Sequence, residues 1–248
     1  MQLLILFALP SEARPTIGIL GGSERIHGLP FKAFCVDHSS HEITMAETGM
    51  GVENATGVFL HLLQTDKPDA VLSIGYCGAL SPDTSVGDVV LASSVCLIEG
   101  QNVETLSLPD NRELFGKLAS RFPVRAGTFI TMKKWMKKRD IAPYVAPGMM
   151  SPVCDMETFG VAQICRSRAL PFFALRAVSD GADTEIFFDP WDVCDKSGKY
   201  SAARAMRFFL TRPHLLSHVI ELYRSSKIAS SNLAQAVSAL IQLMADSS

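Results

Sequence analysis

Asp180 is the residue of this chain whose type and position best suit acid–base chemistry. It lies in Ser179-Asp180-Gly181, directly after the continuously apolar run of a predicted strand, 171–178. Because ligands bind at the C-terminal strand ends of open α/β sheets, a carboxylate here is a candidate ligand-binding residue. Asp followed by Gly is also ordinary turn chemistry, so the residue type alone leaves both interpretations open.

Two glutamates occupy similar positions. Glu12 follows the first predicted strand, 2–8, and Glu157 lies in Asp155-Met156-Glu157-Thr158, where a strand gives way to a helix. Each could be no more than a favourable charge in the first turn of a helix. In a cleft, the Glu157 carboxylate could instead accept hydrogen bonds from two ribose hydroxyls.

Glycine turns follow two further predicted strands. Thr48-Gly49-Met50-Gly51 separates a strand from a helix, and Gly75-Tyr76-Cys77-Gly78 ends the apolar strand 70–75. Glycine lets a ligand approach the backbone closely, and N–H groups at a helix start can face a polar or anionic ligand. Without a third glycine, the first turn is not a dinucleotide-binding fingerprint.

Composition limits the partners and the location. The chain has 248 residues, is 48% hydrophobic and carries a net charge of −2, which suits one α/β domain and gives no basic surplus for nucleic acid. The six cysteines lack C-x-x-C spacing and are predicted to be reduced thiols of a cytoplasmic protein. The six histidines show no metal-ligand spacing, so neither a metal nor a cofactor is expected.

Two segments have alternative interpretations. The apolar N-terminus lacks a basic region and stops at Pro10, so a buried strand is favoured over a signal peptide. No run reaches the roughly 18 apolar residues of a membrane span. The basic cluster at 133–139, which includes Lys138, is predicted to be a solvated helix face rather than an anion-steering patch.

The elements that must position these residues alternate along the chain. Strands are predicted at 2–8, 43–48, 70–75, 87–97, 124–130 and 171–178, and helices at 53–65, 111–121, 156–168, 201–211 and 213–224. This alternation predicts an α/β fold with helices on both faces of a sheet. The remainder, 225–248, is predicted to be a helical tail to a catalytic domain at 1–224, packed on that body or on a neighbouring subunit.

The order of these motifs resembles the nucleoside phosphorylase/nucleosidase superfamily, from residue 2 to about residue 212. The methylthioadenosine/S-adenosylhomocysteine nucleosidases are the branch that it resembles most. The resemblance implies a three-layer α/β/α fold around a central mixed, twisted sheet that partly closes into a barrel. It also implies a purine nucleoside and water as substrates, and a homodimer or higher homo-oligomer.

The resemblance also implies roles for individual residues. Asp180, next to Ser179, would protonate the purine N7, Met156 and Glu157 would hold the ribose, and Glu12 would activate water. Trp135, or alternatively Phe129, would stack on the base. The remaining residues expected around the substrate are Met136, whose backbone would address the base edge, and Met50, Gly75 and Tyr76.

The residues at the phosphate site of the superfamily indicate whether water or phosphate is the nucleophile. Phosphorylase relatives bind phosphate through an Arg and a Ser, where this chain has Ser73 and Tyr76. Serine cannot replace a bidentate guanidinium, and Tyr76 is expected to fill space that phosphate would need, so hydrolysis is favoured. Phosphorolysis remains the alternative, with Arg14 as the residue that could swing inward.

The substituent on the 5′ carbon stays open. The segment after Asp183, with Phe187 and Phe188, is similar to the hopanoid-associated phosphorylase-like branch, which implies a large apolar 5′ group such as that of an adenosylhopane. A packed lid is the simpler interpretation, and futalosine-like nucleosides are a further possibility. A non-catalytic nucleoside-binding domain on the same fold is the alternative of another class.

Overall fold

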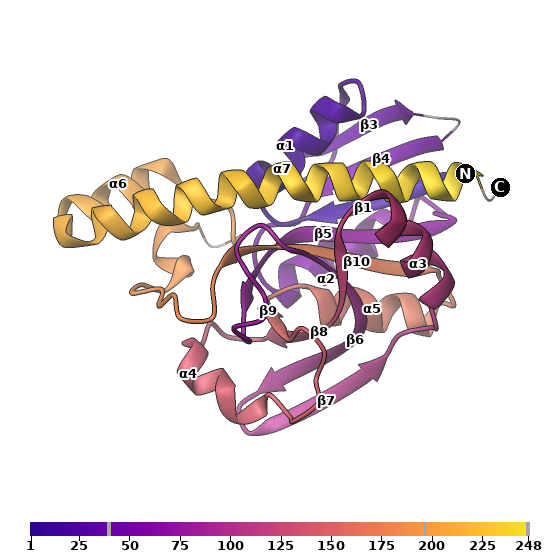
Figure 1. Cartoon of the computed structure of the whole chain (residues 1–248). Coiled ribbons are helices and arrows are strands. Elements are labelled where there is room, and N and C mark those ends of the chain that lie inside the picture. The colour runs from indigo at the N-terminus through magenta and orange to yellow at the C-terminus, as the bar shows by residue number, and fades with distance from the viewer. Residues whose placement is uncertain (39–40, 196, 247–248) are drawn as a thin grey trace.

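The computed structural model describes residues 1–38, 41–195 and 197–246. Within these ranges, ten strands form one mixed sheet that is covered by helices on both faces (Figure 1). The strands are β1 (Gln2–Phe7), β2 (Glu24–Ile26), β3 (Ala33–His38), β4 (His41–Glu47), β5 (Ala70–Ala79), β6 (Val89–Glu99), β7 (Asn102–Ser107), β8 (Val124–Met132), β9 (Val153–Asp155) and β10 (Phe172–Asp180). The helices are α1 (Pro10–Ile19), α2 (Val52–Leu62), α3 (Arg112–Arg121), α4 (Lys138–Ile141), α5 (Thr158–Ser167), α6 (Ala202–Leu210) and α7 (Leu216–Asp246).

Part of the sheet closes on itself. Strand β10 pairs in parallel with β5 and antiparallel with β6, β6 pairs in parallel with β8, and the short β9 joins β8 to β5. These five strands therefore form a closed circuit, and β1, β4, β3 and β2 extend the sheet beyond β5. The expected α/β architecture with a partly closed mixed sheet is confirmed.

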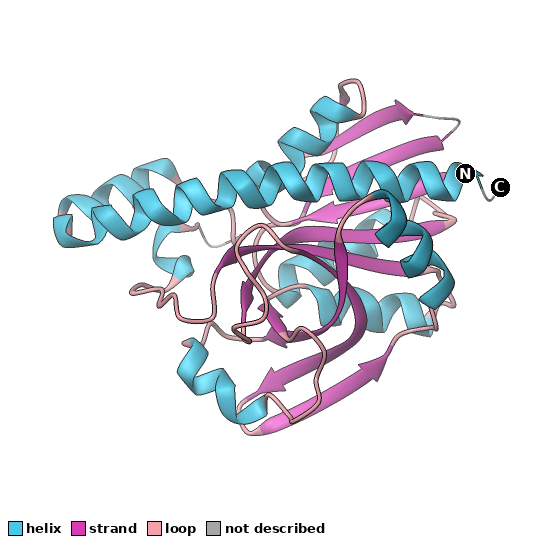
Figure 2. Ribbon diagram, viewed as in Figure 1, coloured by secondary structure: helices cyan, strands magenta, loops and turns pink. Residues whose placement is uncertain are grey.

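The alternation of side chains along β1 separates the two covering layers. Leu3 and Ile5 pack into a core with α1, α3 and α7, whereas Leu4 and Leu6 pack into a second core with α2 and α5. Because successive strand residues point to opposite faces, an unbroken apolar strand requires helices on both sides. Figure 2 shows this arrangement of strands between helices.

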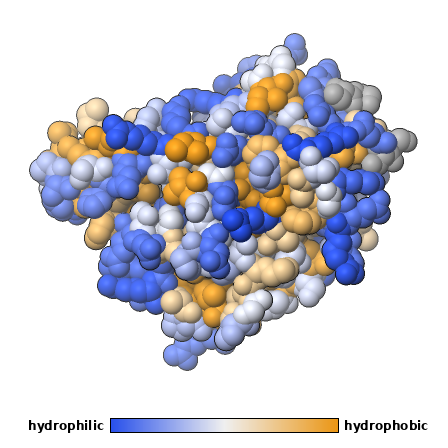
Figure 3. All heavy atoms as spheres, viewed as in Figure 1, coloured by the Kyte–Doolittle hydropathy of each residue, from blue (hydrophilic) through white to orange (hydrophobic). Residues whose placement is uncertain are grey.

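Helix α7 is longer than the sequence predicts. Residues 216–246, which span most of the predicted helix 213–224 and the described part of the predicted tail 225–248, form one continuous helix, so residue 225 lies inside α7. Its C-terminal half is buried against the body through Leu233, Val237 and Ile241. Its N-terminal half projects beside α6, where exposed apolar and polar side chains lie next to each other (Figure 3).

The stretch 213–246 is also long and apolar enough to cross a membrane by length and composition alone. Half of its most apolar window is buried inside the molecule, in contact with β10 and α1. Since that burial accounts for its apolar composition, the stretch is weak evidence for a membrane span.

Several elements are not predicted by the sequence pattern. Helix α1 contains Pro15 and Gly18, two residues that disfavour helices, although Pro10 suits a helix start. The strands β2, β3 and β7 also lie outside the predicted ranges. Of these, α1 matters most for chemistry, because its first turn carries Glu12.

Candidate active site

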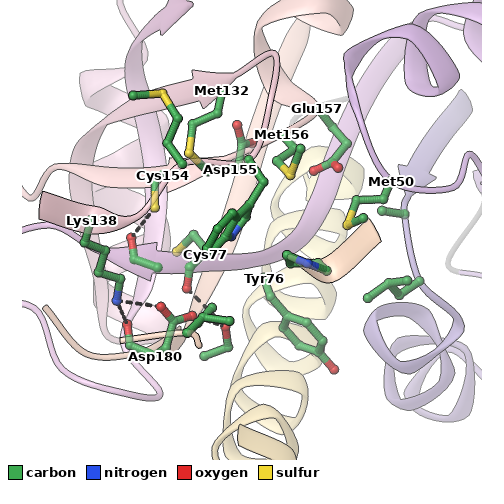
Figure 4. Close-up of a pocket in the computed structure, with 18 of the residues that line it drawn as sticks. Met50, Tyr76, Cys77, Met132, Lys138, Cys154, Asp155, Met156, Glu157 and Asp180 are labelled. Carbon is green, nitrogen blue, oxygen red and sulfur yellow. Dashed lines mark hydrogen bonds and ion pairs between the residues drawn. The ribbon is translucent and has the colours of Figure 1, made fainter. Parts of the chain in front are cut away.

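One cavity of about 220 Å³ lies at the C-terminal ends of β1, β5 and β10. Its lining includes nine of the ten predicted site residues: Glu12, Met50, Tyr76, Trp135, Met136, Met156, Glu157, Ser179 and Asp180. The tenth, Gly75, lies directly behind Glu12, where an added Cβ would be 2.8 Å from the Glu12 Oε1. Figure 4 shows Lys138 and Asp180 on one side of this cavity and Glu157 and Met50 on the other.

Glu12 is a buried carboxylate held by backbone N–H groups. Its Oε2 accepts hydrogen bonds from the N–H of Ala8 at 2.9 Å and of Leu9 at 2.8 Å, and its Oε1 accepts one from the N–H of Tyr76 at 2.9 Å. Burial raises the pKa of Glu12, while these hydrogen bonds and the positive charge of Arg176 act against that rise. A carboxylate with a raised pKa is a stronger base near neutral pH than an exposed one.

Glu157 lies across the cavity, directly before the first residue of α5. Its Oε1 accepts a hydrogen bond from the N–H of Gly51 at 2.8 Å. Burial and the nearby charge of Asp155 raise the pKa of Glu157 to about 7, against the opposing effect of Arg176, 3.9 Å from Oε2. Oε2 therefore remains available to hydroxyl donors of a ligand.

Arg176 is fully buried and lies behind these two glutamates. Its Nη2 lies 3.0 Å from Asp155 Oδ2 and donates to Ser73 Oγ at 3.1 Å. Its Nε also donates to Asp155 Oδ2, at 3.1 Å. The guanidinium is thus committed to protein acceptors, while its charge still acts on both Glu12 and Glu157.

Asp180 ends β10 and is only 5% exposed. Its Oδ1 accepts a hydrogen bond from Ser179 Oγ at 2.8 Å. Its Oδ2 lies 2.5 Å from Nζ of Lys138, which is the first residue of α4. The prediction that the basic cluster is a solvated helix face is therefore wrong for Lys138, because this lysine turns inward onto a buried carboxylate.

Apolar side chains form the rest of the wall. Trp135, Met136 and Met156 line the cavity and pack into one cluster with Met50. Phe129, the alternative to Trp135 as the stacking residue, lies fully buried in the core of the sheet and does not line the cavity. Of the two rings predicted as alternatives for stacking on a base, Trp135 is therefore the one that lines the cavity.

Tyr76 lines the cavity, and its hydroxyl and backbone are both hydrogen-bonded. The hydroxyl donates to the carbonyl of Ser11 at 3.0 Å, and the backbone N–H donates to Glu12. That its ring fills the space of a phosphate stays a prediction. Arg14 is exposed on α1 and does not line the cavity. Since Arg176 is already paired, the lining offers no free guanidinium to an anion within the described part of the chain.

The segment 186–191 lies at the mouth of the cavity. Ile186 and Pro190 contribute to its lining. Phe188 instead packs on the rings of Phe208 and Phe209 in α6, at 5.7 and 5.5 Å between ring centroids. The segment is therefore both a packed cover and part of the wall.

Within the residues that the structure describes, no group of three or more metal-ligating side chains is found.

The functional residues missed by the sequence analysis are Lys138, Arg176 and Asp155. An Arg inside an otherwise apolar strand must find a buried partner, and this signal could have identified Arg176. Asp155 precedes Met156 in a motif already quoted, so its position was visible but its role was not. Nothing in the spacing of the basic cluster distinguishes Lys138 from its neighbours.

Comparison with known proteins places this geometry in context. The family model described as "Phosphorylase superfamily" matches residues 3–209. An aminodeoxyfutalosine nucleosidase of Campylobacter jejuni is 24% identical over 224 residues, covering 82% of this chain and 95% of the relative. A 5′-methylthioadenosine/S-adenosylhomocysteine nucleosidase of Shewanella piezotolerans is 26% identical over 204 residues, covering 73% and 85%.

Solved structures agree on the fold. A 5′-methylthioadenosine/S-adenosylhomocysteine nucleosidase of Helicobacter pylori, in complex with a substituted pyrrolidin-3-ol, aligns over 98% of both chains with a TM-score of 0.73 and 16% identity. At this identity the likeness extends to the fold alone.

Proposed function

Because the chain belongs to the phosphorylase superfamily, we propose that it is an N-ribosyl hydrolase that cleaves the glycosidic bond of a purine nucleoside. The observation that carries this proposal is the placement of Glu12 and Asp180, two buried carboxylates, in the lining of one cavity. The nucleosidases among the similar proteins support the same reaction class.

The residues divide the reaction between two sides of the cavity. Cleavage of an N-glycosidic bond passes through an oxocarbenium-like state while the departing purine gains negative charge. Asp180 delivers a proton to N7 of the leaving base. Trp135 stacks on the ring of the base, and Met136 lies at the edge of that ring. Glu157 and Met156 hold the ribose, and Glu12 takes a proton from the attacking water.

Water is favoured over phosphate by the charges around the nucleophile. A phosphate in the place of the attacking water would lie beside the negative charge of Glu12. The guanidinium of Arg176 is already bound to Asp155 and Ser73. An anion would therefore have to bind without a free guanidinium, which is the group that best matches its geometry.

The 5′ group is proposed to be apolar close to the ribose. Met50, Ile186 and Pro190 supply apolar lining that the base and the ribose do not require. A 5′-methylthioadenosine- or S-adenosylhomocysteine-like nucleoside is the substrate proposed first, and a futalosine-like nucleoside comes second. Comparing kcat/KM for adenosine, inosine, methylthioadenosine, adenosylhomocysteine and futalosine ranks these candidates.

We also propose a cytoplasmic homo-oligomer. All six cysteines are free thiols, and five of them are buried, as suits a reducing compartment. Size-exclusion chromatography with light scattering measures the assembly.

Product analysis tests the reaction itself. In phosphate-free buffer the enzyme should release base and free sugar, at a rate that added phosphate leaves nearly unchanged. Glu12→Gln should abolish turnover while a substrate analogue still binds, whereas Glu53→Gln, exposed in the first turn of α2, serves as the matched control. Stoichiometric ribose 1-phosphate would make the protein a phosphorylase, and binding without base release would make it a binding domain.

A further inference from the structure

Lys138 makes three contacts, and all of them are with oxygen atoms of one short segment. Its Nζ lies 2.5 Å from Asp180 Oδ2, donates to the carbonyl of Asp180 at 3.1 Å, and donates to the carbonyl of Gly181. The side chains of Lys138 and Asp180 are 14% and 6% exposed. The pair is therefore largely withdrawn from water at one end of the cavity (Figure 4).

These contacts fix the charge state of the lysine. Nζ donates hydrogen bonds to two carbonyl oxygens and lies against a carboxylate oxygen, and a neutral amine would have to turn its lone pair toward one of these three oxygens, whereas the ammonium form carries N–H groups only. The ammonium of Lys138 thus holds a proton directly beside a carboxylate that lines the cavity.

The carboxylate still has room for a ligand. Although Asp180 Oδ2 is close to Lys138, it is buried and has no aligned hydrogen-bond donor among the described residues. The contact is an ion pair rather than a well-aligned hydrogen bond, so one lone pair of Oδ2 is unmet. A protonated purine N7 is a donor of the kind that this oxygen lacks.

We propose that Lys138 and Asp180 act as one proton-holding pair, in which Lys138 stores the proton that Asp180 delivers to N7 of the leaving purine. This role rests on the proposed glycosidic cleavage and adds to it a residue that positions and supplies the proton.

The step balances as a simple relay. As the C1′–N9 bond breaks, its electron pair stays on the purine, the Lys138 ammonium gives a proton to the Asp180 carboxylate, and Asp180 passes a proton on to N7. Water gives its hydroxyl to C1′ and its proton to Glu12. Lys138 regains a proton from solvent and Glu12 loses one to solvent, so the net reaction adds one water across the glycosidic bond.

The thiols beside the pair carry no charge. Cys77 on β5 and Cys154 on β9 face Asp180, and burial raises the pKa of Cys154 to about 12 and that of Cys77 well above its usual value, so both thiols stay neutral. Asp155 and Arg176 also act on these thiols but neutralise each other. The remaining charged groups of the lining near α4 are Lys137 and Glu185.

The test compares pH profiles of kcat/KM from about pH 5 to about pH 9 for the wild type, Lys138→Met and Lys138→Arg. With Lys138→Met, the proton is held only by Asp180, so the alkaline limb should move to lower pH. The rate should fall about 10²-fold at about pH 8 but less than about tenfold at about pH 5. Lys138→Arg, which keeps the cation, should stay within about tenfold of the wild type and keep its alkaline limb.

Lys134→Met is the matched control, because Lys134 is exposed in the same basic cluster and should leave the profile unchanged. A Lys138→Met enzyme within about threefold of the wild type at every pH would overturn the proposal. An equal loss at every pH would also overturn it, because that result describes a structural role only.

Binding of free adenine and free hypoxanthine, measured by calorimetry over the same pH range, separates this proposal from the proposed function. Wild-type affinity should persist above about pH 8, and Lys138→Met should lose it there. If Lys138→Met binds the free bases with the same affinity as the wild type at every pH, the relay is refuted even if the enzyme turns over. If the wild type neither binds a base nor releases one, the proposed function fails, and the relay fails with it.

Discussion

The guanidinium of Arg176 and the carboxylate of Asp155 form an ion pair closed off from solvent, with Nη2 3.0 Å from Oδ2 and both side chains 1% exposed. The Asp155 carboxylate also accepts hydrogen bonds from the Thr131 hydroxyl at 2.6 Å and from the N–H of Thr158 at 3.2 Å. The pair joins β9 to β10 beneath the cavity. Its charge balance therefore supports both the fold and the two glutamates above it.

Asp155→Asn should be strongly destabilising, because it removes the nearest counter-charge of the buried Arg176 guanidinium. Removing one partner of a buried ion pair lowers the free energy of unfolding by about 3–5 kcal/mol. Urea denaturation of the wild type and the variant measures this difference. Asp110→Asn, which breaks the exposed pair with Arg112, is the control and should leave the urea midpoint unchanged. Equal midpoints for the two variants would contradict the role given to Asp155.

Gly75→Ala should reduce activity while the protein remains folded. The new Cβ would lie 2.8 Å from Glu12 Oε1, so the carboxylate must shift from the N–H of Tyr76. A displaced general base should lower kcat about 10²-fold. Gly57→Ala, at an exposed position of α2 where a Cβ meets nothing within 4 Å, should keep full activity and raise the free energy of unfolding by about 0.5–1 kcal/mol. Identical kinetics for both variants would show that Glu12 is not positioned by this contact.

The part of the site that follows β1, β5 and β10 could be predicted from the sequence because parallel strands end at the same edge, whereas the roles of Trp135 and Met136 were implied by the family resemblance. Residue 7 of β1 lies opposite residue 74 of β5, and residue 177 of β10 lies opposite residue 76. This register brings the loops that carry Glu12, Tyr76 and Asp180 together. A carboxylate directly after an apolar run is therefore informative even without coordinates.

The rest depends on tertiary contacts that leave no local pattern. Lys138 lies among five basic residues at 133–139, and only the path of the chain past β10 selects it to meet Asp180. The side chain of Tyr76 turns toward Ser11 because α1 packs beside it, and α1 itself was missed. Hydrophobic periodicity indicates which face is buried, but it does not show which polar side chain turns inward.

Glu157→Gln should make the stability of the protein less dependent on pH. The folded-state pKa of Glu157 is raised to about 7 by burial and by Asp155, so folding favours the protonated form. A raised pKa stabilises the fold fully below the unfolded-state value of about 4.3, and that contribution is lost as the pH rises through about 7. The variant should therefore gain stability over the wild type between about pH 5 and about pH 8, by about 1–3 kcal/mol.

Urea denaturation of the wild type and Glu157→Gln at about pH 4.5 and about pH 8 checks this sign. A constant difference between the two proteins at both pH values would contradict the raised pKa. The same substitution should weaken the binding of ribosides more than the binding of the matching 2′- and 3′-deoxy nucleosides, since an amide accepts through one oxygen only. Equal effects on ribosides and deoxy nucleosides would remove Glu157 from the ribose site.

Trp135→Ala should weaken nucleoside binding with little effect on the fold, because Trp135 lines the cavity and is the residue proposed to stack on the base. Stacking of a base on an aromatic side chain contributes about 1–3 kcal/mol, so KM should rise by roughly 5- to 150-fold. Trp135→Phe keeps an aromatic face and should recover most of the loss. Phe129→Leu is the opposing control: this ring lies in the core, so the variant should lose stability and keep its KM. If KM instead rises with Phe129→Leu and stays unchanged with Trp135→Ala, the base stacks elsewhere, and the cavity wall at Trp135 has another role.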